Sequence, residues 1–320
     1  MYPLESAQSS FHMRSFFPSF SPGALREGPP RRSPPVRVAG ISGDGSVAAG
    51  LAHTARYQVK GITVNRMVRS WGRFVAGRVL PRWAYPVLRG PLKGARFVLG
   101  TVAGEGGGAT VYVNMSEREQ TAAFVSSVRE GDVFFDIGAN VGYYSILGSR
   151  IVGPRGKVFA IEPAIANIAA LYRHVTLNRA ANVSIVTAAC SDRLSLAVFQ
   201  SGVNSATGHL AERAAEGPQS SLRSPVPTLT VDAIVQETDA VPDVLKIDVE
   251  GAELSVLRGA EVTLRQSRPI VFLSTHSDAL RSSCLRFLEE LGYVWRPLGA
   301  EKHQASEFLV RHSERRDREA

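Results

Sequence analysis

The chain has 320 residues, of which 44% are hydrophobic and 21% are charged, so it is long enough to bury one substantial core. No run approaches the roughly 20 apolar residues of a membrane span, and residues 1–20 contain no compact apolar segment of the secretory type. The two cysteines, Cys190 and Cys284, lack metal-ligand spacing and give no evidence of a disulfide framework. We therefore expect a cytoplasmic protein with one enzyme-sized domain.

The net charge of +8 is distributed unevenly along the chain. Residues 61–104 contain eight basic and no acidic side chains, whereas residues 105–310 contain 18 basic and 23 acidic ones. The larger part of the chain is therefore mildly acidic, which argues against a catalytic face that binds nucleic acid.

The N-terminal third divides into two segments. Residues 1–60 are rich in Pro, Ser, Gly and Arg without a sustained apolar period, and we interpret them as a disordered extension. Residues 61–115 predict a basic helix over 62–83, followed by a hairpin of 96–101 with 110–113. The helix either packs on the domain with its arginines in water or makes peripheral contact with an anionic membrane surface.

The main domain is expected over residues 116–312, with a short tail at 313–320. It opens with a helix over 117–128, and the apolar run Val133-Phe-Phe135 then predicts a buried strand. The run is followed by Asp136-Ile-Gly-Ala-Asn-Val-Gly142, and helical residues resume by 145–150. The two glycines of this turn permit a tight bend and a close approach of the backbone to a ligand, which would face the free N–H groups of the helix.

The acid at the strand end indicates which ligand binds. A dinucleotide site would need G-x-G-x-x-G around a pyrophosphate, which Asp136 would repel. An acid suits a cation, such as the ammonium and sulfonium of S-adenosylmethionine (SAM). A second strand over 157–161 ends in Glu162, which is placed to accept hydrogen bonds from two ribose hydroxyls. The two acids lie 26 residues apart, the length of one βαβ step.

The middle of the chain predicts a helix over 166–178, a strand over 183–189 and a hairpin arm over 194–199. The polar segment 200–225 is either a solvated insertion or a binding loop. In the second case a polyhydroxylated acceptor could meet the following side chains: Asn204, Ser205, Thr207 and His209. Residues 228–235 then predict a strand that runs into a short helix.

The strand over 244–248 carries a lysine in an apolar setting. Period-2 alternation places Lys246 and Asp248 on one face, and a strand buried on both faces requires a partner for the lysine, for which Asp248 is nearest. Glu250 and Glu253 open a helix that continues through Leu264, where the helix dipole favours acids. A strand over 269–275 ends in His276, and a helix over 278–291 with strands over 293–296 and 307–311 completes the sheet.

Several of these motifs together resemble the FkbM-type SAM-dependent methyltransferases. They are Asp136-Ile-Gly-Ala-Asn-Val-Gly142, Glu162-Pro163, Asn178, Ala189-Cys-Ser-Asp192, Lys246-Ile-Asp-Val-Glu-Gly-Ala-Glu253 and Leu257-Arg-Gly-Ala260. The resemblance covers about residues 89–309. It implies an α/β class I methyltransferase (Rossmann-like) fold, in which a mostly parallel sheet has helices on both faces and a small N-terminal hairpin is added. It also implies the cofactor SAM and, usually, O-methylation of a hydroxyl on a sugar, glycolipid or natural product.

The expected SAM contacts are Asp136, Gly138, Ala139, Asn140, Gly142, Glu162, Ser191 and Asp192. The last two are adenine contacts by resemblance, although a turn signal alone explains them equally well. Removal of the proton of a hydroxyl acceptor needs a base, and the candidates are Asp248 first, then Glu250 and His276. We assign no metal, although Asp248, Glu250, Glu253 and His276 offer ligands that suit Mg²⁺ or Mn²⁺.

Three other functions remain open from the sequence. A nucleic-acid methyltransferase would use the basic N-terminal arm, and a non-catalytic module would bind SAM alone. An NAD-dependent oxidoreductase would share the α/β order but needs the glycine fingerprint that this chain lacks. The favoured partner is a small-molecule or glycan acceptor.

Overall fold

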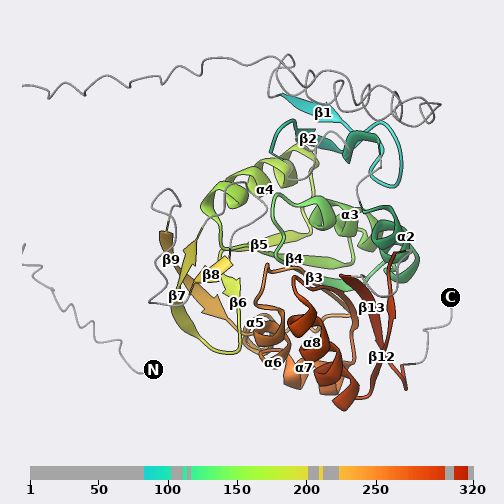
Figure 1. The fold of residues 1–320 in the computed structure, drawn as a ribbon. Helices are drawn as coiled ribbons and strands as arrows, with labels where there is room; N and C mark the ends of the chain where they lie inside the picture. Colours follow the sequence, from blue (N-terminus) through green and yellow to red (C-terminus); the bar gives the residue numbers. More distant parts are fainter. Residues whose placement is uncertain are drawn as a thin grey trace, which may run out of the picture. The chain divides into compact units, whose positions relative to one another are not determined.

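The computed structural model describes residues 83–101, 111–113, 117–200, 209–211, 223–299 and 306–315. Its centre is a seven-stranded sheet in the order β12-β13-β11-β10-β3-β4-β5 (Figure 1). The strands are β3 (Val133–Ile137), β4 (Lys157–Ile161), β5 (Val183–Val186), β10 (Val244–Ile247), β11 (Ile270–Ser274), β12 (Tyr293–Pro297) and β13 (Glu307–His312). The five strands from β5 to β11 are parallel, and β13 and β12 pair antiparallel. The predicted mostly parallel sheet is confirmed.

Helices cover both faces of this sheet (Figure 1). They are α2 (Arg118–Ser127), α3 (Tyr143–Val152), α4 (Ile165–Leu177), α5 (Val231–Thr238), α6 (Glu253–Arg258), α7 (Glu261–Ser267) and α8 (Asp278–Glu290). Successive strand residues face opposite sides, so Phe134 packs with Phe124 and Ile146 in one core, and Phe135 packs with Val256 in the other. Strands buried on both faces explain the continuous apolar runs in the sequence.

The predicted helix from Glu253 through Leu264 is in fact two helices, α6 and α7. A Cβ on Gly259 would collide with the carbonyl oxygen of Ser191, so the chain passes closely here. Asp232 of α5 then accepts hydrogen bonds from the N–H groups of Val262 (3.1 Å) and Thr263 (2.8 Å). These bonds cap the first turn of α7 from another helix, a long-range contact that helical spacing alone does not reveal.

A second, four-stranded sheet has the order β6-β9-β7-β8. Its strands are β6 (Ala189–Cys190), β7 (Ser195–Gln200), β8 (His209–Ala211) and β9 (Arg223–Leu229). The hairpin arm over 194–199 is confirmed as β7, but the strand predicted over 183–189 ends at Val186, and β6 pairs parallel with β9 instead. The segment 200–225 is not one loop, because it contains β8 and the start of β9. Its candidates Asn204, Ser205 and Thr207 lie outside the described residues.

Two prolines, Pro225 and Pro227, explain why β9 was predicted too short. Proline lacks an N–H group and argues against a strand with neighbours on both edges. In the structure β6 pairs only with Thr228 and Leu229 of β9, so the edge beside the prolines meets no partner from β6. Strand β9 therefore extends to Arg223, through both prolines.

The N-terminal hairpin exists but pairs differently from the prediction. Strand β1 (Ala84–Pro86) pairs antiparallel with β2 (Arg96–Val98), whereas Val111–Val113 forms the 3₁₀ helix η1. The intervening turn closes on itself, because the N–H of Val87 donates to the carbonyl of Ala95 at 2.7 Å. The predictions for residues 1–60 and 62–82 lie outside the described part of the chain. Each described helix is too short or too polar to cross a bilayer.

Two side chains hold this hairpin on the domain, one on α4 and one on the residue that follows it. The amide of Asn178, which follows α4, accepts from the N–H of Arg96 and donates to its carbonyl, both at 2.8 Å. Buried His174 accepts from the N–H of Val98 at 3.0 Å and meets the carbonyl of Val141 at 2.7 Å. Burial lowers the pKa of His174, so the ring is kept neutral and uses one nitrogen as acceptor and the other as donor.

Candidate functional site

A pocket of about 430 Å³ lies at the carboxyl ends of the central strands. This is the edge where open α/β sheets place their ligands, and the volume suits a small-molecule site. The lining includes the turn after β3, Glu162 after β4, the segment between β10 and α6, and His276 after β11. The strand-end residues predicted from the sequence are therefore brought together in one place.

Glu162 anchors one half of the pocket. Its side chain is buried, and its carboxylate accepts hydrogen bonds from the N–H of Asn140 (2.8 Å), the N–H of Ala164 (2.9 Å) and the side-chain amide of Asn167 (3.1 Å). Burial raises the pKa of Glu162, and these donors partly offset that effect. A carboxylate has about four acceptor positions, so room remains for a hydroxyl of a ligand.

Two buried oxygens in the pocket wall have no hydrogen-bond partner among the described residues. Asp136 accepts a bond from the hydroxyl of Ser145 (2.6 Å) through Oδ2, but its Oδ1 is unpaired. The Oδ1 atom of Asn140 is unpaired as well. Burial raises the pKa of Asp136, and Lys246 opposes that shift by favouring the charged form. A ligand with a cationic N–H donor would satisfy these oxygens, as expected for the ammonium of SAM.

The two glycines of the turn adopt the tight bend that was predicted, and the structure adds a second reason for them. Gly138 has φ +80°, and a Cβ there would collide with the carbonyl oxygen of Asp248. Gly142 has φ +91°, and a Cβ there would press on Leu171. Gly138 and Ala139 line the pocket, whereas Gly142 does not. Both glycines therefore serve close packing within the protein in a left-handed backbone conformation.

Ser191 and Asp192 are not among the lining residues of the pocket. Their side chains contact each other at 3.3 Å, and Asp192 forms an exposed ion pair with Arg193 at 3.0 Å. The wall beside them consists of Ala188, Ala189 and Cys190 instead. Burial raises the pKa of the Cys190 thiol to about 12, so this sulfur is an unreactive part of the wall.

Lys246 and Asp248 form the predicted ion pair in the other half of the pocket. Lys246 Nζ lies 3.0 Å from Asp248 Oδ2. In the sheet, Lys246 of β10 is paired with Asp136 of the adjacent strand β3. The lysine also lies 4.9 Å from the centre of the Tyr144 ring. Burial alone would raise the pKa of Asp248, but Lys246 and then His276 outweigh it, so the pKa is lowered and the carboxylate stays charged.

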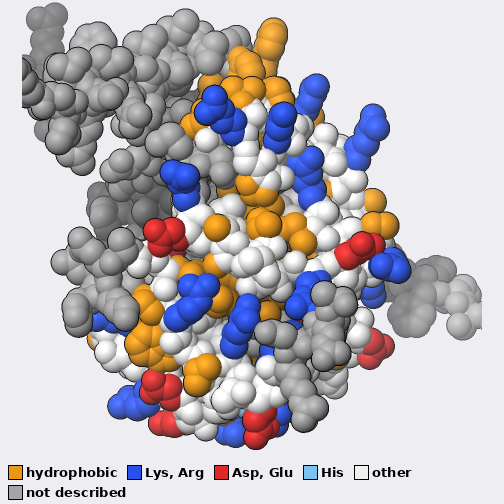
Figure 2. All heavy atoms as spheres, turned by 90° about the vertical axis from the view of Figure 1, so that its right-hand side faces the viewer, with side chains coloured by type: hydrophobic (Ala, Val, Ile, Leu, Met, Phe, Trp, Pro, Cys, Tyr) orange, Lys and Arg blue, Asp and Glu red, His pale blue; other side chains and the backbone are white. Residues whose placement is uncertain are grey.

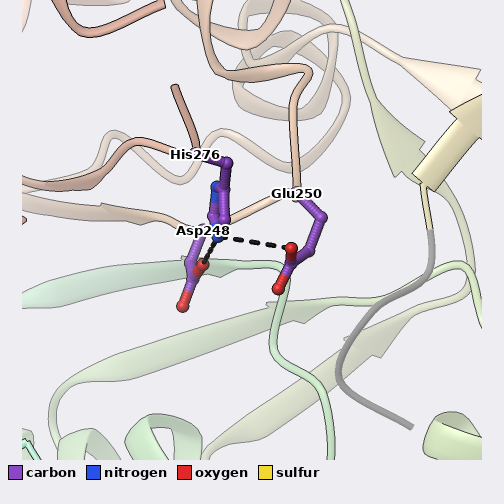
Figure 3. Close-up of side chains that lie close together, drawn as sticks. All are labelled: Asp248, Glu250 and His276. Atoms are coloured by element: carbon purple, nitrogen blue, oxygen red, sulfur yellow. Dashed lines mark ion pairs between the residues drawn. The ribbon is translucent and has the colours of Figure 1, made fainter. Parts of the chain in front are cut away.

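His276 faces the carboxylates of Asp248 and Glu250 (Figure 3), and its other ring nitrogen contacts Glu253. Its Nε2 is 3.6 Å from Asp248 Oδ1 and 3.4 Å from Glu250 Oε2, and its Nδ1 is 2.7 Å from Glu253 Oε1. Glu250 and Glu253 raise the pKa of His276 to about 10, although burial opposes this. The protein by itself therefore holds His276 as a cation, which is poorly suited to accept a proton.

Glu253 lies at the start of α6, as predicted, and it is also a fully buried partner of His276. Its Oε1 also accepts from the N–H of Gly251 at 2.9 Å, and its Oε2 is buried with no hydrogen-bond partner within the described ranges. Glu250 has φ +53°, a left-handed conformation that is rare for a residue with a side chain. The chain thus turns sharply after β10, and this turn brings Glu250 and Glu253 to opposite nitrogens of one imidazole.

Some pocket residues were not predicted from the sequence. They are Glu117, Tyr143, Tyr144, Phe199 and Glu307. Burial, followed by repulsion from Glu117 and Asp248, raises the pKa of Glu307 to about 7. The two tyrosines directly follow the Asp136–Gly142 motif and could have been inferred from it. Glu307 reaches the pocket only because β13 pairs with β11, where Glu307 opposes Ser274.

A comparison with protein-family models identifies a family for this chain. Residues 136–295 match the family model of the methyltransferase FkbM domain. The comparison with curated proteins finds no match.

Solved structures similar to this chain include three methyltransferase-type proteins. A methyltransferase FkbM from Methylobacillus flagellatus is 15% identical over 66% of this chain and 56% of that chain, with a TM-score of 0.42. Fibrillarin from Aeropyrum pernix with S-adenosyl-L-methionine is 16% identical over 60% and 72%, with a TM-score of 0.39. A SAM-dependent O-methyltransferase from Thermotoga maritima is 15% identical over 62% and 66%, with a TM-score of 0.37. The chain thus spans little more than half of the first of these structures.

Proposed function

The chain belongs to the methyltransferase FkbM family and is a SAM-dependent methyltransferase with the class I fold, and we propose that it methylates a hydroxyl oxygen of a sugar, glycolipid or natural product. The matched region, residues 136–295, contains the acids at the ends of β3, β4 and β10. The observation that carries the proposal is the convergence of Asp248 and Glu250 beside the cofactor half of the pocket. Carboxylates in that position suit an acceptor that must lose a proton.

The cofactor half of the pocket fits SAM. When bound, SAM supplies a methyl group activated by its sulfonium. The unpaired oxygen of Asp136 would hold the ammonium, and Glu162 would accept from the ribose while the turn residues Gly138, Ala139 and Asn140 line the wall. These contacts fix the cofactor in place, which is most of what an in-line transfer requires of the protein.

The acceptor half provides orientation and a proton acceptor. Asp248 is kept charged by Lys246 and would accept a hydrogen bond from the acceptor hydroxyl. Glu250 lies beside it, and the nearest cation recorded for it among the described residues is His276 at 3.4 Å, farther than the 3.0 Å lysine contact of Asp248, so Glu250 is the better candidate to take the proton. His276, held as a cation by Glu253 and Glu250, would balance the charge of these two acids.

The charge of the pocket favours a neutral acceptor over a polyanion. Among the residues that the structure describes, its wall contains six acids, Glu117, Asp136, Glu162, Asp248, Glu250 and Glu307, against the two cationic side chains Lys246 and His276. On the face shown in Figure 2, the basic side chains are separated by uncharged and apolar surface rather than forming one continuous patch. A phosphate backbone would be repelled by such a pocket.

The two free cysteines are both buried thiols, which is typical of the reducing cytoplasm in which we place the enzyme.

A product screen tests this function. The full chain is incubated with SAM and panels of glycans, glycolipids and hydroxylated natural products, and products are searched by mass spectrometry for a gain of about 14 daltons, one methylene. We expect a methoxy product in NMR and a turnover about 10²–10⁴ lower for Glu250→Gln, the usual contribution of a positioned base. Glu261→Gln, the same change in an exposed ion pair on α7, serves as the control. Methylation of nitrogen or carbon, or full activity of Glu250→Gln, would contradict the proposal.

A further inference from the structure

Asp248, Glu250 and His276 present three ligand atoms to one point of the pocket wall (Figure 3). These atoms, one from each residue, all lie within 4.8 Å of one another. His276 Nε2 is 3.6 Å from Asp248 Oδ1 and 3.4 Å from Glu250 Oε2. Ligands held at about 2.1 Å by one ion are separated by about 3.0 Å in octahedral and about 3.4 Å in tetrahedral geometry. The two Nε2 distances are close to the tetrahedral separation and longer than the octahedral one, so a shared ion would draw the three side chains closer together.

The same distances are too long for good hydrogen bonds. An N–H···O bond normally spans about 2.7–3.2 Å, and both contacts of Nε2 exceed that range. The nitrogen thus faces two carboxylate oxygens across a gap that a hydrogen bond does not close. A cation larger than a proton would bridge all three atoms.

Glu253 supports the histidine in the way that metal sites require. Metal-binding imidazoles usually donate their second N–H to a carboxylate or carbonyl, which fixes the ring and increases its basicity. His276 Nδ1 meets Glu253 Oε1 at 2.7 Å, which directs Nε2 toward Asp248 and Glu250. The Glu253 side chain is 0% exposed, and its Oε2 has no hydrogen-bond partner in the part of the chain that the structure describes. A buried, incompletely paired carboxylate behind the ring is an independent sign that this site is built for positive charge.

We propose that Asp248, Glu250 and His276 bind a divalent cation of the Mg²⁺ or Mn²⁺ class, with Glu253 positioning the histidine. Two carboxylate oxygens and one imidazole nitrogen form a donor set that suits Mn²⁺ and Mg²⁺. Lys246 engages the other oxygen of Asp248, so Oδ1 remains available to the ion. The three side chains are 30%, 33% and 31% exposed, so the remaining coordination positions open into the pocket.

The role of the ion rests on the proposed function. An acceptor hydroxyl coordinated at an open position would be fixed beside the methyl group, and its O–H would become more acidic because the ion withdraws electron density. The ion would take the place of the proton on Nε2, and Asp248 and Glu250 would each bind it through one oxygen. The proton of the acceptor hydroxyl would pass to the second carboxylate oxygen of Glu250, as the methyl group leaves the sulfur of SAM for the acceptor oxygen. This arrangement favours acceptors with an accessible hydroxyl, or two neighbouring hydroxyls, that can chelate the ion.

Manganese binding tests the site on the full chain. Chelator-treated protein is titrated with Mn²⁺, and the free ion is followed by its electron paramagnetic resonance signal. We expect one ion per chain, at least tenfold weaker binding in Glu250→Gln and His276→Gln, and about 10–100-fold weaker binding in Glu253→Gln, the usual effect of losing a residue that supports a ligand. Glu261→Gln changes an exposed acid on α7 and should bind Mn²⁺ like the unmodified chain.

Calorimetric SAM titrations of the same metal-free samples verify that each variant is folded and separate this inference from the proposed function. The site is refuted if millimolar Mn²⁺ does not bind a SAM-competent protein, or if all four variants bind it equally. Mn²⁺ binding that depends on Glu250 and His276 in a chain that does not bind SAM would uphold the site and refute the proposed function. Turnover that survives full chelation would refute the catalytic role of the ion.

Discussion

Lys246 is a buried cation between two acids, and the pair it forms with Asp248 can be tested by removing either partner. Lys246→Met leaves Asp136 and Asp248 close together without the cation that compensates them. We expect the free energy of unfolding to fall by about 3–5 kcal/mol, the usual cost of an uncompensated buried charge. Urea denaturation measures this loss. A fall below about 1 kcal/mol would show that water or a proton readily replaces the lysine.

Asp248→Asn separates the catalytic role of the acid from its structural one. The amide is nearly isosteric, and Asp136 remains beside Lys246, so stability should fall less than in Lys246→Met. SAM affinity should be mostly retained, whereas turnover should fall by about 10–100-fold, because the acceptor hydroxyl loses a hydrogen bond to a charged partner, worth about 1.5–3 kcal/mol. Melting temperature, SAM affinity and turnover are measured on one preparation. Full activity in a stable variant would remove Asp248 from the acceptor site.

Asp136→Asn tests the cofactor half. The amide oxygen can still accept the bond from Ser145, but the face toward the pocket loses its negative charge. Because a hydrogen bond to a charged partner is worth about 1.5–3 kcal/mol, SAM affinity should fall roughly tenfold or more. Ser145→Ala changes only the other oxygen and should have the smaller effect. Equal calorimetric affinities in the two variants would argue against an ammonium at this carboxylate.

At the scale of single residues, the sequence predicts those contacts that local geometry dictates. The Lys246–Asp248 pair follows from period-2 alternation in a buried strand, and the pocket positions of Asp136 and Glu162 follow from the meeting of parallel strand ends. The contact of His276 with Glu253 depends on a turn with positive φ at Glu250. No periodicity encodes such a turn, so this contact is visible only in the structure.

Strand β13 adds a titrating group to the pocket, which makes stability depend on pH. The pKa of Glu307 is about 7 in the folded protein, above its ordinary value near 4.5, so the folded state binds this proton more tightly than the unfolded chain does. The stability that this tighter proton binding contributes is fully present below pH 4.5 and is lost as the pH rises toward 7. Glu307→Gln should therefore match the unmodified chain near pH 4.5 and be more stable than it at pH 8.

Melting temperatures across this pH range, with Glu261→Gln as the exposed control, measure the difference. A Glu307→Gln curve that runs parallel to that of the unmodified chain would show that Glu307 titrates normally.

The attachment of the β1–β2 hairpin to α4 is also testable. Asn178→Ala removes both bonds to the backbone of Arg96 and a third to the carbonyl of His174. These groups are partly exposed and can turn to water, so we expect a loss of about 1–2 kcal/mol and faster hydrogen exchange at the Arg96 amide. Asn178→Asp keeps the acceptor for the Arg96 N–H but loses the donors, so an intermediate effect is expected. Unchanged exchange in both variants would show that the His174 contact and the packing of Phe97 hold the hairpin without Asn178.

At the scale of elements, strand positions were more predictable than strand partners. The apolar runs that became β3, β4, β10 and β11 are buried on both faces and therefore stand out in the sequence. The partners of β2 and β6 were predicted wrongly, because a two- or three-residue strand has too little pattern to specify its neighbour. Contacts with side chains far away in sequence determine the position of such a strand instead, as Asn178 does through its bonds to Arg96 of β2.

At the scale of the whole molecule, the sheet order follows from ordinary rules. Parallel strands joined by helices cross over with one handedness, which limits the orders that a βαβ chain can adopt. The antiparallel addition of β13 and β12 is what brings Glu307 to the pocket. The sequence predicted these strands but not this consequence for the site.

A truncation tests the prediction for the N-terminal segment. Residues 1–60 carry no periodic apolar face, so their deletion should leave a folded enzyme that binds SAM with unchanged affinity. Differential scanning calorimetry of the shortened and full chains provides the comparison. A large drop in melting temperature on truncation would reveal that an ordered element had been removed.

The contact between Gly138 and the carbonyl of Asp248 limits how this domain can be recombined. The cofactor turn and the acceptor turn touch backbone to backbone, with no space for even one methyl group between them. A chimera that takes residues 136–142 from one relative and 244–253 from another would join two backbone paths that were never fitted to each other. Exchange of acceptor specificity between relatives should therefore succeed when both turns are transferred together, and fail when the crossover point falls between them.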